Sequence, residues 1–244
     1  MSETTDREGE RGSLRHKLAA AAVAFICVPA VIALGVAVWD NRKYYIVSLL
    51  VILLSMIPFA LLFERRKPKA RELVVLAVMV AIGVAGRAAF YMLPQFKPVT
   101  AIVIICGVAF GCESGFISGA MIGFLSNFIF GQGPYTPWQM EAWGLVGFIA
   151  GLLFHKKEGS VPKLLPLCIY GFFASFLLYG VIVDISTVFT SGMLINRQTV
   201  LATLQAGVLF NLIHGAATVV FLLALARPML KKLDRMRVKY GLLE

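Results

Sequence analysis

The stretch that decides the fold is ESGFISGAMIGFLSNFIFGQGPYTPWQMEAWGLVGFIAGLLF, which runs from Glu113 to Phe154. It has the pattern of two apolar helices joined by the polar turn GQGPYTPW at Gly131–Trp138. Proline does not fit inside a hydrogen-bonded helix, and glycine permits positive φ, so the chain is expected to reverse in this turn. The first helix carries Gly115, Gly119 and Gly123 at a spacing of four. In lipid, that spacing predicts a face that packs closely against another helix.

Composition indicates an all-α integral membrane protein. Of the 244 residues, 59% are hydrophobic and only 15% are charged. Several apolar runs exceed the roughly 18 residues that identify a transmembrane helix. The first run is too long for a signal-peptide core and is expected to be retained. The eight predicted spans are about Leu18–Trp39, Tyr45–Phe63, Glu72–Leu93, Pro98–Gly111, Ser114–Gly131, Gln139–Phe154, Leu164–Ile185 and Val200–Arg227.

The fourth predicted span is too short to cross a bilayer alone. Pro98–Gly111 has 14 residues, which is roughly 21 Å of helix against a hydrocarbon core of about 30 Å. We therefore expect this segment to be buried among its neighbours or to join an irregular segment that lines a cavity.

The basic residues predict the orientation. With the N-terminus inside, eighteen Lys and Arg residues fall in inner segments and four in outer ones. This asymmetry favours an even number of spans with both termini cytoplasmic. The charged segment ERRKPKARE, at Glu64–Glu72, marks the predicted internal boundary. The predicted parts are a cytoplasmic tail (1–17), a two-helix membrane extension with a basic linker (18–71), a six-helix substrate-binding core (72–227) and a basic cytoplasmic tail (228–244).

Polar residues at membrane depth point to a binding site within the core. Arg87 lies inside a span, where a charge costs about 2.5–3.5 kcal/mol, so it either snorkels to the interface or faces a pocket with Glu141 or Asp184 as partner. In the last helix, polar and small residues repeat on one face. That stripe consists of Thr199, Thr203, Gly207, Asn211, His214 and Thr218.

Most of these residues gather toward the predicted outer half, which favours a pocket that opens outward under short loops. The aromatic residues also fit an interfacial belt, and a buried histidine also fits an interhelical hydrogen bond. The predicted substrate-binding residues are Arg87, Tyr91, Asn127, Tyr135, Trp138, Glu141, Asp184, Asn211 and His214.

The sequence lacks the motifs that mark several classes of chemistry. There is no G-x-x-x-x-G-K-[ST] for nucleotide phosphates and no H-E-x-x-H for zinc. The three histidines and four cysteines are too dispersed for a metal centre. The net charge is +10, and the Lys and Arg residues that produce it lie between and beyond the apolar runs. They form no aromatic-interleaved motif that could read a base, so nucleic acid is excluded as a ligand. We predict no metal, no cofactor and no enzymatic activity.

Three features carry a resemblance to a known family. They are the ridge of Ala77, Ala81 and Ala85, the helix ESGFISGAMIGFLSN, and FGQGPYTPWQMEAWGLVGFIAG at Phe130–Gly151. From about Glu72 to the end, the chain resembles the substrate-binding S components of energy-coupling factor (ECF) vitamin transporters. The resemblance implies a six-helix protein of a prokaryotic plasma membrane, with both termini cytoplasmic and a micronutrient bound on the outer side.

The resemblance also implies partners and a substrate class. The alanine ridge would dock onto a T component that carries two ABC-type ATPases, which power the inward delivery of the ligand. The subgroup looks closest to S components for cobalamin or related corrinoids, with thiamin, riboflavin, biotin, queuosine-type bases and a metal-vitamin precursor left open. The two front helices exceed the six-helix pattern.

Two other functions remain open at this point. One is an integral-membrane enzyme that acts on a lipid-linked substrate, with His214, Asn211 and Glu141 as its acid–base group. The other is a membrane scaffold whose polar stripe only joins helices, in which case replacing Asn211 costs about 0.6–2 kcal/mol of stability and no small molecule is held.

Overall fold

The computed structural model describes residues 69–155 and 162–240, together with residues 53, 54, 56, 57, 60, 61, 63 and 64. Every regular element in this part of the chain is helical, which confirms the all-α prediction. The elements are α4 (Ala70–Ala89), α5 (Val99–Phe110), α6 (Cys112–Phe130), α7 (Thr136–Phe154), α8 (Leu164–Phe173), the π-helical segment η2 (Ala174–Tyr179), α9 (Gly180–Thr190) and α10 (Arg197–Tyr240). Because α8, η2 and α9 follow one another directly, they form one continuous helical segment, Leu164–Thr190.

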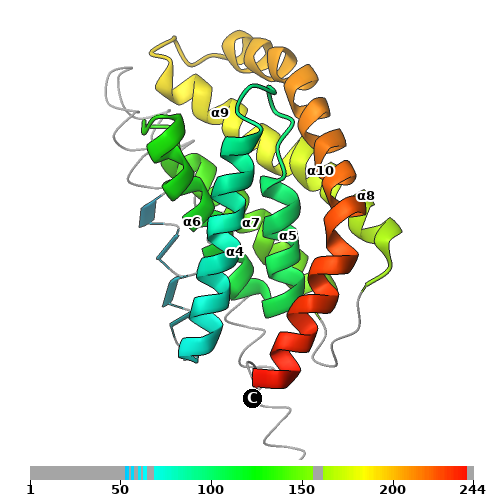
Figure 1. Ribbon diagram of the computed structural model, residues 1–244. Coiled ribbons are helices and arrows are strands. Elements are labelled where there is room, and N and C mark those ends of the chain that lie inside the picture. The colour runs from blue at the N-terminus through cyan, green and yellow to red at the C-terminus, as the bar shows by residue number, and fades with distance from the viewer. Residues whose placement is uncertain are drawn as a thin grey trace, which may run out of the picture.

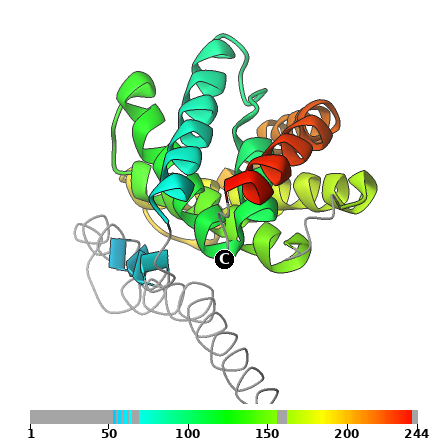
Figure 2. The same ribbon diagram turned by 60° about the horizontal axis from the view of Figure 1, so that its bottom comes forward.

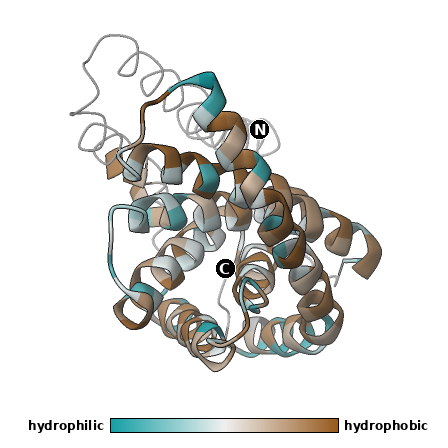
Figure 3. Cartoon of the chain, turned by 90° about the horizontal axis from the view of Figure 1, so that it is seen from above, coloured by the Kyte–Doolittle hydropathy of each residue, from teal (hydrophilic) through white to brown (hydrophobic). Residues whose placement is uncertain are grey.

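Except for the end of the last helix, the helices match the predicted core spans within a few residues. Within the described residues, four helices are long and apolar enough to cross a membrane. They are Ala70–Ala89, Cys112–Phe130, Leu164–Thr190 and Arg197–Met236. Seen from above, the helices are coloured mainly brown and white, with hydrophilic colour confined to shorter patches (Figure 3). The predicted two-helix extension (18–71) lies outside the described residues apart from a few positions at its end.

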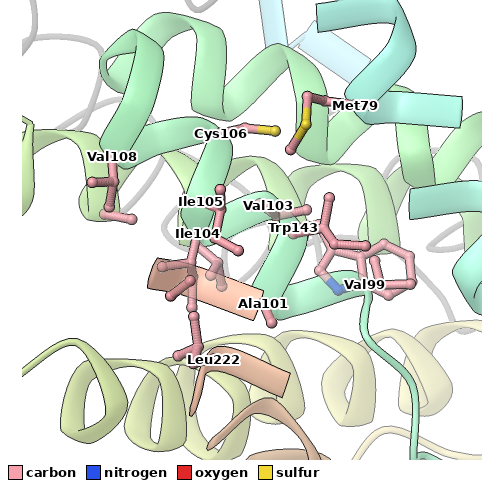
Figure 4. Close-up of a cluster of buried hydrophobic side chains, with 14 of the residues drawn as sticks. Met79, Val99, Ala101, Val103, Ile104, Ile105, Cys106, Val108, Trp143 and Leu222 are labelled. Carbon is pink, nitrogen blue, oxygen red and sulfur yellow. The ribbon is translucent and has the colours of Figure 1, made fainter. Parts of the chain in front are cut away.

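The short helix α5 forms the centre of the bundle. It lies between α4 and α10 (Figures 1 and 2), and all of its residues except Ala109 are buried. Its 12 residues give roughly 18 Å of helix, too little to span lipid. Ile104 of α5 faces Leu222 of α10 in the apolar core (Figure 4). The prediction that this span is buried among its neighbours is confirmed.

The glycine-rich face of α6 brings its backbone into contact with α7. A Cβ atom at Gly115 would overlap the carbonyl oxygen of Gly147, and one at Gly147 would overlap the carbonyl oxygen of Gly115. At Gly119 it would overlap the carbonyl oxygen of Trp143. The predicted close-packing face therefore packs on α7, its partner across the turn. The chain reverses at Gly131, where φ is 99°, a value that glycine adopts without strain.

The last helix is longer than the sequence indicated. The predicted span ended at Arg227, before Pro228, but α10 continues through that proline to Tyr240. A proline inside a helix removes one backbone hydrogen bond and usually favours a break. Here Leu230 and Leu233 are buried beyond it, with exposed fractions of 5% and 6%, and join the main apolar core. That packing holds the helix past the proline, so residues 228–240 of the predicted basic tail continue α10.

Candidate functional site

A cavity lies at one end of the bundle, which we call the loop end. This end carries the connecting segments 90–98, 131–135 and 191–196, at the top of Figure 1 and away from the C-terminus. The cavity has a volume of about 270 Å³. Its polar lining residues are Arg87, Gln95, Lys97, Gln139, Asp184, Thr187, Asn211 and His214, and its aromatic ones are Phe130, Trp143, Tyr179 and Phe210.

Arg87 of α4 is the most deeply placed cation of this site. Its side chain is 8% exposed, and Nη1 donates to the hydroxyl of Ser126 and, at 2.8 Å, to Oδ1 of Asn127. The guanidinium also lies over two rings, 4.3 Å from the centroid of Phe130 and 5.0 Å from that of Trp143. Of the two sequence interpretations, the structure supports the one in which Arg87 faces a pocket.

The hydrogen-bond partners of Arg87 differ from those expected. We predicted a carboxylate, either Glu141 or Asp184. Among the described residues, Asp184 instead accepts a hydrogen bond from Asn211 at 2.7 Å, while Arg87 is bonded by neutral oxygens of α6. Residues 126 and 127, about one turn from the end of α6, lie beside the last turn of α4, whereas Asp184 comes from α9.

Asn127 holds two of the cavity-lining residues, Arg87 and Gln139, in place by hydrogen bonds. It is fully buried, and its Nδ2 donates to Thr136 Oγ1 at 3.0 Å and to Gln139 Oε1 at 2.9 Å. Because its Oδ1 accepts from Arg87, one amide joins α6, the start of α7 and the cation. We predicted Asn127 as a substrate-binding residue, and its contacts make it a residue that orients Arg87 and Gln139.

Lys97 adds a second cation to the cavity. Its Nζ donates to the carbonyl of Leu93 at 3.0 Å and lies 5.6 Å from the ring centroid of Phe130. Burial lowers the pKa of Lys97, and the nearby charge of Arg87 lowers it further. The cavity thus holds two cationic side chains and the carboxylate of Asp184.

His214 of α10 belongs to a network that crosses three helices. Trp143 Nε1 donates to Thr100 Oγ1 at 3.0 Å, and Thr100 Oγ1 lies 2.8 Å from His214 Nε2. The ring of Tyr179 meets the imidazole edge to face, with centroids 4.7 Å apart, and lies 4.8 Å from the ring of Trp143. His214 therefore makes the interhelical hydrogen bond considered for it and also lines the cavity.

The polar stripe of α10 turns inward, as its spacing predicts. Gly207, Asn211 and His214 line the cavity, and Thr218 continues the face toward η2 through a 2.7 Å hydrogen bond with Ser175. This face both joins helices and lines the cavity, so the two interpretations of the stripe apply to different parts of it.

Besides Asn127, four predicted site residues are not among those that line the cavity. Tyr91 is 57% exposed and packs against Phe130, and Tyr135 donates to the carbonyl of Gly131 at 2.6 Å, which closes the turn. Trp138 stacks on Phe189 at 5.6 Å, and Glu141 is buried in α7. Residues 138 and 141 share one face of α7, whereas residues 139 and 143, four apart, present the face that lines the cavity.

Other lining residues were absent from the predicted set. Gln95 and Lys97 lie in the irregular segment between α4 and α5, where no periodicity marks a side chain as inward. Gln95 has a φ of 56°, an uncommon conformation for a residue other than glycine. Thr187 lies three residues after Asp184 on the same helix face, a signal that would have identified it.

Comparison with known families decides the class of this chain. The family described as ECF-type riboflavin transporter, S component, matches residues 67–232, well over half of the sequence. The chain belongs to this family. No curated protein and no solved structure matches it. The matched range starts before α4 and ends within α10, so it includes every residue of the cavity.

Membership in the S-component family confirms the resemblance seen in the sequence. Together with the membrane-length helices, it makes the chain a multi-pass membrane protein and an S component of a vitamin transporter. S components are typically subunits that bind ligand and not enzymes, which favours the transport hypothesis over the enzyme one.

Proposed function

We propose that this S component binds a flavin, riboflavin or a close analogue, in the cavity at the loop end and delivers it into the cell. The observation that carries the proposal is the composition of that cavity. It combines aromatic rings with hydrogen-bonding groups of both polarities, including Arg87, Asp184 and Asn211. A flat conjugated ligand with carbonyl acceptors and a hydroxylated chain matches such a lining, and the family's description names riboflavin.

The volume of the cavity favours a ligand of this size over a corrinoid. At about 270 Å³, it lies just below the range of roughly 300–1,000 Å³ common for small-molecule sites. A flavin is a three-ring heterocycle with a short polyol. A corrinoid adds a macrocycle, amide arms and a nucleotide loop, which need far more room. The family match does not support the cobalamin-type ligand suggested by the sequence, and we retain cobalamin as the competitor in the tests.

Flavin fluorescence provides a direct test of the substrate. We expect titration of the purified chain in detergent to quench riboflavin fluorescence saturably, at one ligand per chain, because stacking on Trp143 and Tyr179 quenches the ring. Cobalamin and thiamin in excess should not displace the bound riboflavin. Saturable displacement by cobalamin, or a complete lack of quenching, would exclude the flavin assignment.

The alanine ridge of α4 supplies the proposed docking face for the T component. Ala77, Ala81 and Ala85 are all exposed in the structure, although internal packing would require them to be buried. Small side chains on an exposed helix face allow another membrane helix to approach closely. We propose that a T component with two ABC-type ATPases docks here and supplies the energy, since the sequence carries no P-loop motif.

A bulky side chain on this ridge should separate transport from binding. For Ala81→Trp, we expect cellular uptake of riboflavin to fall at least tenfold while the isolated chain binds riboflavin as before, because the ridge lies apart from the cavity-lining residues. The matched control is Leu223→Trp, which lies on α10, already carries a 56% exposed apolar side chain and does not line the cavity. Loss of binding or of expression in Ala81→Trp would instead indicate internal packing.

A further inference from the structure

We infer that a hydrogen-bond relay locks His214 as its Nδ1–H tautomer, so that this site selects ligands that offer a hydrogen-bond acceptor to the imidazole. The inference rests on the proposed function, because it specifies what the ligand of the same cavity must present. It concerns Trp143, Thr100 and His214, which come from α7, α5 and α10.

The relay starts at an atom with only one possible role. Indole Nε1–H is a donor and never an acceptor, so Trp143 donates to Thr100 Oγ1, 3.0 Å away. The hydroxyl of Thr100 is fully buried and has His214 Nε2 as its remaining neighbour, at 2.8 Å. Its proton therefore has one acceptor among the described residues, the Nε2 lone pair, and an imidazole that accepts at Nε2 carries its proton on Nδ1.

The other protonation states leave more buried groups unsatisfied. If Nε2 carried the proton, the Thr100 oxygen would accept from two donors, its own proton would have no acceptor among the described residues, and Nδ1 would be an acceptor without a donor. A doubly protonated ring would also leave the Thr100 hydroxyl proton without an acceptor, and it would add a third cation to a cavity that holds Arg87 and Lys97. Because buried polar groups without partners are destabilising, the Nδ1–H tautomer is favoured.

The Nδ1–H group then remains for the ligand. His214 is 3% exposed and lines the cavity, and its Nδ1 has no hydrogen-bond partner among the described residues. The imidazole is held in place by the edge-to-face contact with Tyr179. A donor fixed in this way beside the rings of Trp143 and Tyr179 calls for a planar heteroaromatic ligand with a ring carbonyl or a pyridine-type nitrogen.

The tautomer can be measured without any ligand. We would label the full chain with ¹⁵N-histidine, purify it in detergent and record the imidazole nitrogens by NMR, identifying His214 by the loss of its signals in His214→Asn. The inference expects a protonated Nδ1 and an unprotonated Nε2. Thr100→Val, which removes the hydroxyl at nearly constant volume, should shift the ring toward the Nε2–H form, and Thr100→Ser should not.

Binding of riboflavin then tests the role of the tautomer. Thr100→Val should weaken binding about tenfold, because a lone pair replaces a donor opposite the ligand's acceptor, whereas Thr100→Ser should stay within about threefold of the unaltered chain. Riboflavin should also shift the Nδ1 signal of the unaltered chain. Thermal unfolding of both variants checks that they fold. If Thr100→Val does not fold, the tautomer measured in the unaltered chain and in Thr100→Ser still tests the inference.

Each outcome has a distinct meaning. An Nε2–H tautomer in the unaltered chain would overturn the inference. It would also be overturned if the tautomer changes in Thr100→Val and this variant still binds riboflavin as tightly as the unaltered chain. If the unaltered chain binds no riboflavin, the proposed flavin function fails, and the ligand-free spectrum alone then upholds or overturns the locked tautomer.

Discussion

Replacing Arg87 with methionine is expected to weaken ligand binding by roughly 10- to 100-fold, because a hydrogen bond from a charged group contributes about 1.5–3 kcal/mol. Both hydrogen bonds of Arg87 to α6 come from Nη1, so among the described residues Nη2 and Nε remain as donors for a ligand in the cavity. The expected effect is therefore on affinity, measured by riboflavin fluorescence titration.

The stability of Arg87→Met should change little. The variant loses the contacts with Ser126 and Asn127 but also removes a charge that costs about 2.5–3.5 kcal/mol within a membrane. Arg197→Met is the matched control, since Arg197 begins α10 at the loop end, is exposed and does not line the cavity. Unchanged affinity in Arg87→Met, or a loss that merely follows a collapse in the melting temperature, would contradict the role given to Arg87.

Gly115→Ala is expected to have the largest effect on stability. The added methyl group would overlap backbone atoms of Gly147 and Gly107, which cannot rotate away. Overpacking usually costs about 1–3 kcal/mol, and a clash with backbone on two sides should reach or exceed the upper end of that range. We expect a large drop in the melting temperature of the detergent-purified chain, or loss of monodisperse protein.

Gly123→Ala provides a control on the same face of α6, two turns further along. Its added methyl would lie 3.2 Å from Met140 Cα and from Trp143 Cε3, a contact that small shifts relieve. Alanine also favours a helix over glycine by about 1 kcal/mol, so this variant should stay close to the parent in stability. Equal melting temperatures for the two variants would show that the α6–α7 crossing is less tight than the structure indicates.

Sequence patterns were sufficient wherever periodicity or backbone chemistry decides the structure. Apolar runs located the helices from α4 to α10, and the spacing of Gly115 and Gly119 predicted the close crossing that the structure shows with α7. The stripe that contains Asn211 and His214 identified the inward face of α10. In each case a helix repeats its faces every three to four residues, so one sequence signal determines which residues share a face.

Tertiary contacts account for what the sequence could not provide. No periodicity applies to the segment that holds Gln95 and Lys97, so its side chains could not be assigned to the cavity. On α7, the sequence assigned Trp138 and Glu141 to the site, but the rotation of the helix directs Trp143 to the cavity and places Glu141 elsewhere in the packed interior. Pro228 was a valid stop signal that packing of Leu230 and Leu233 overrode.

Identification of the ligand that stays bound tests the central claim most directly. The chain would be purified in detergent without added ligand, and native mass spectrometry would be combined with an absorbance spectrum of the released small molecule. The account predicts one flavin-sized molecule per chain with a flavin spectrum, or an empty chain that riboflavin stabilises against heat. A corrinoid spectrum would contradict the flavin assignment. A chain that stays empty and is stabilised by no vitamin in a panel would contradict ligand binding in this cavity.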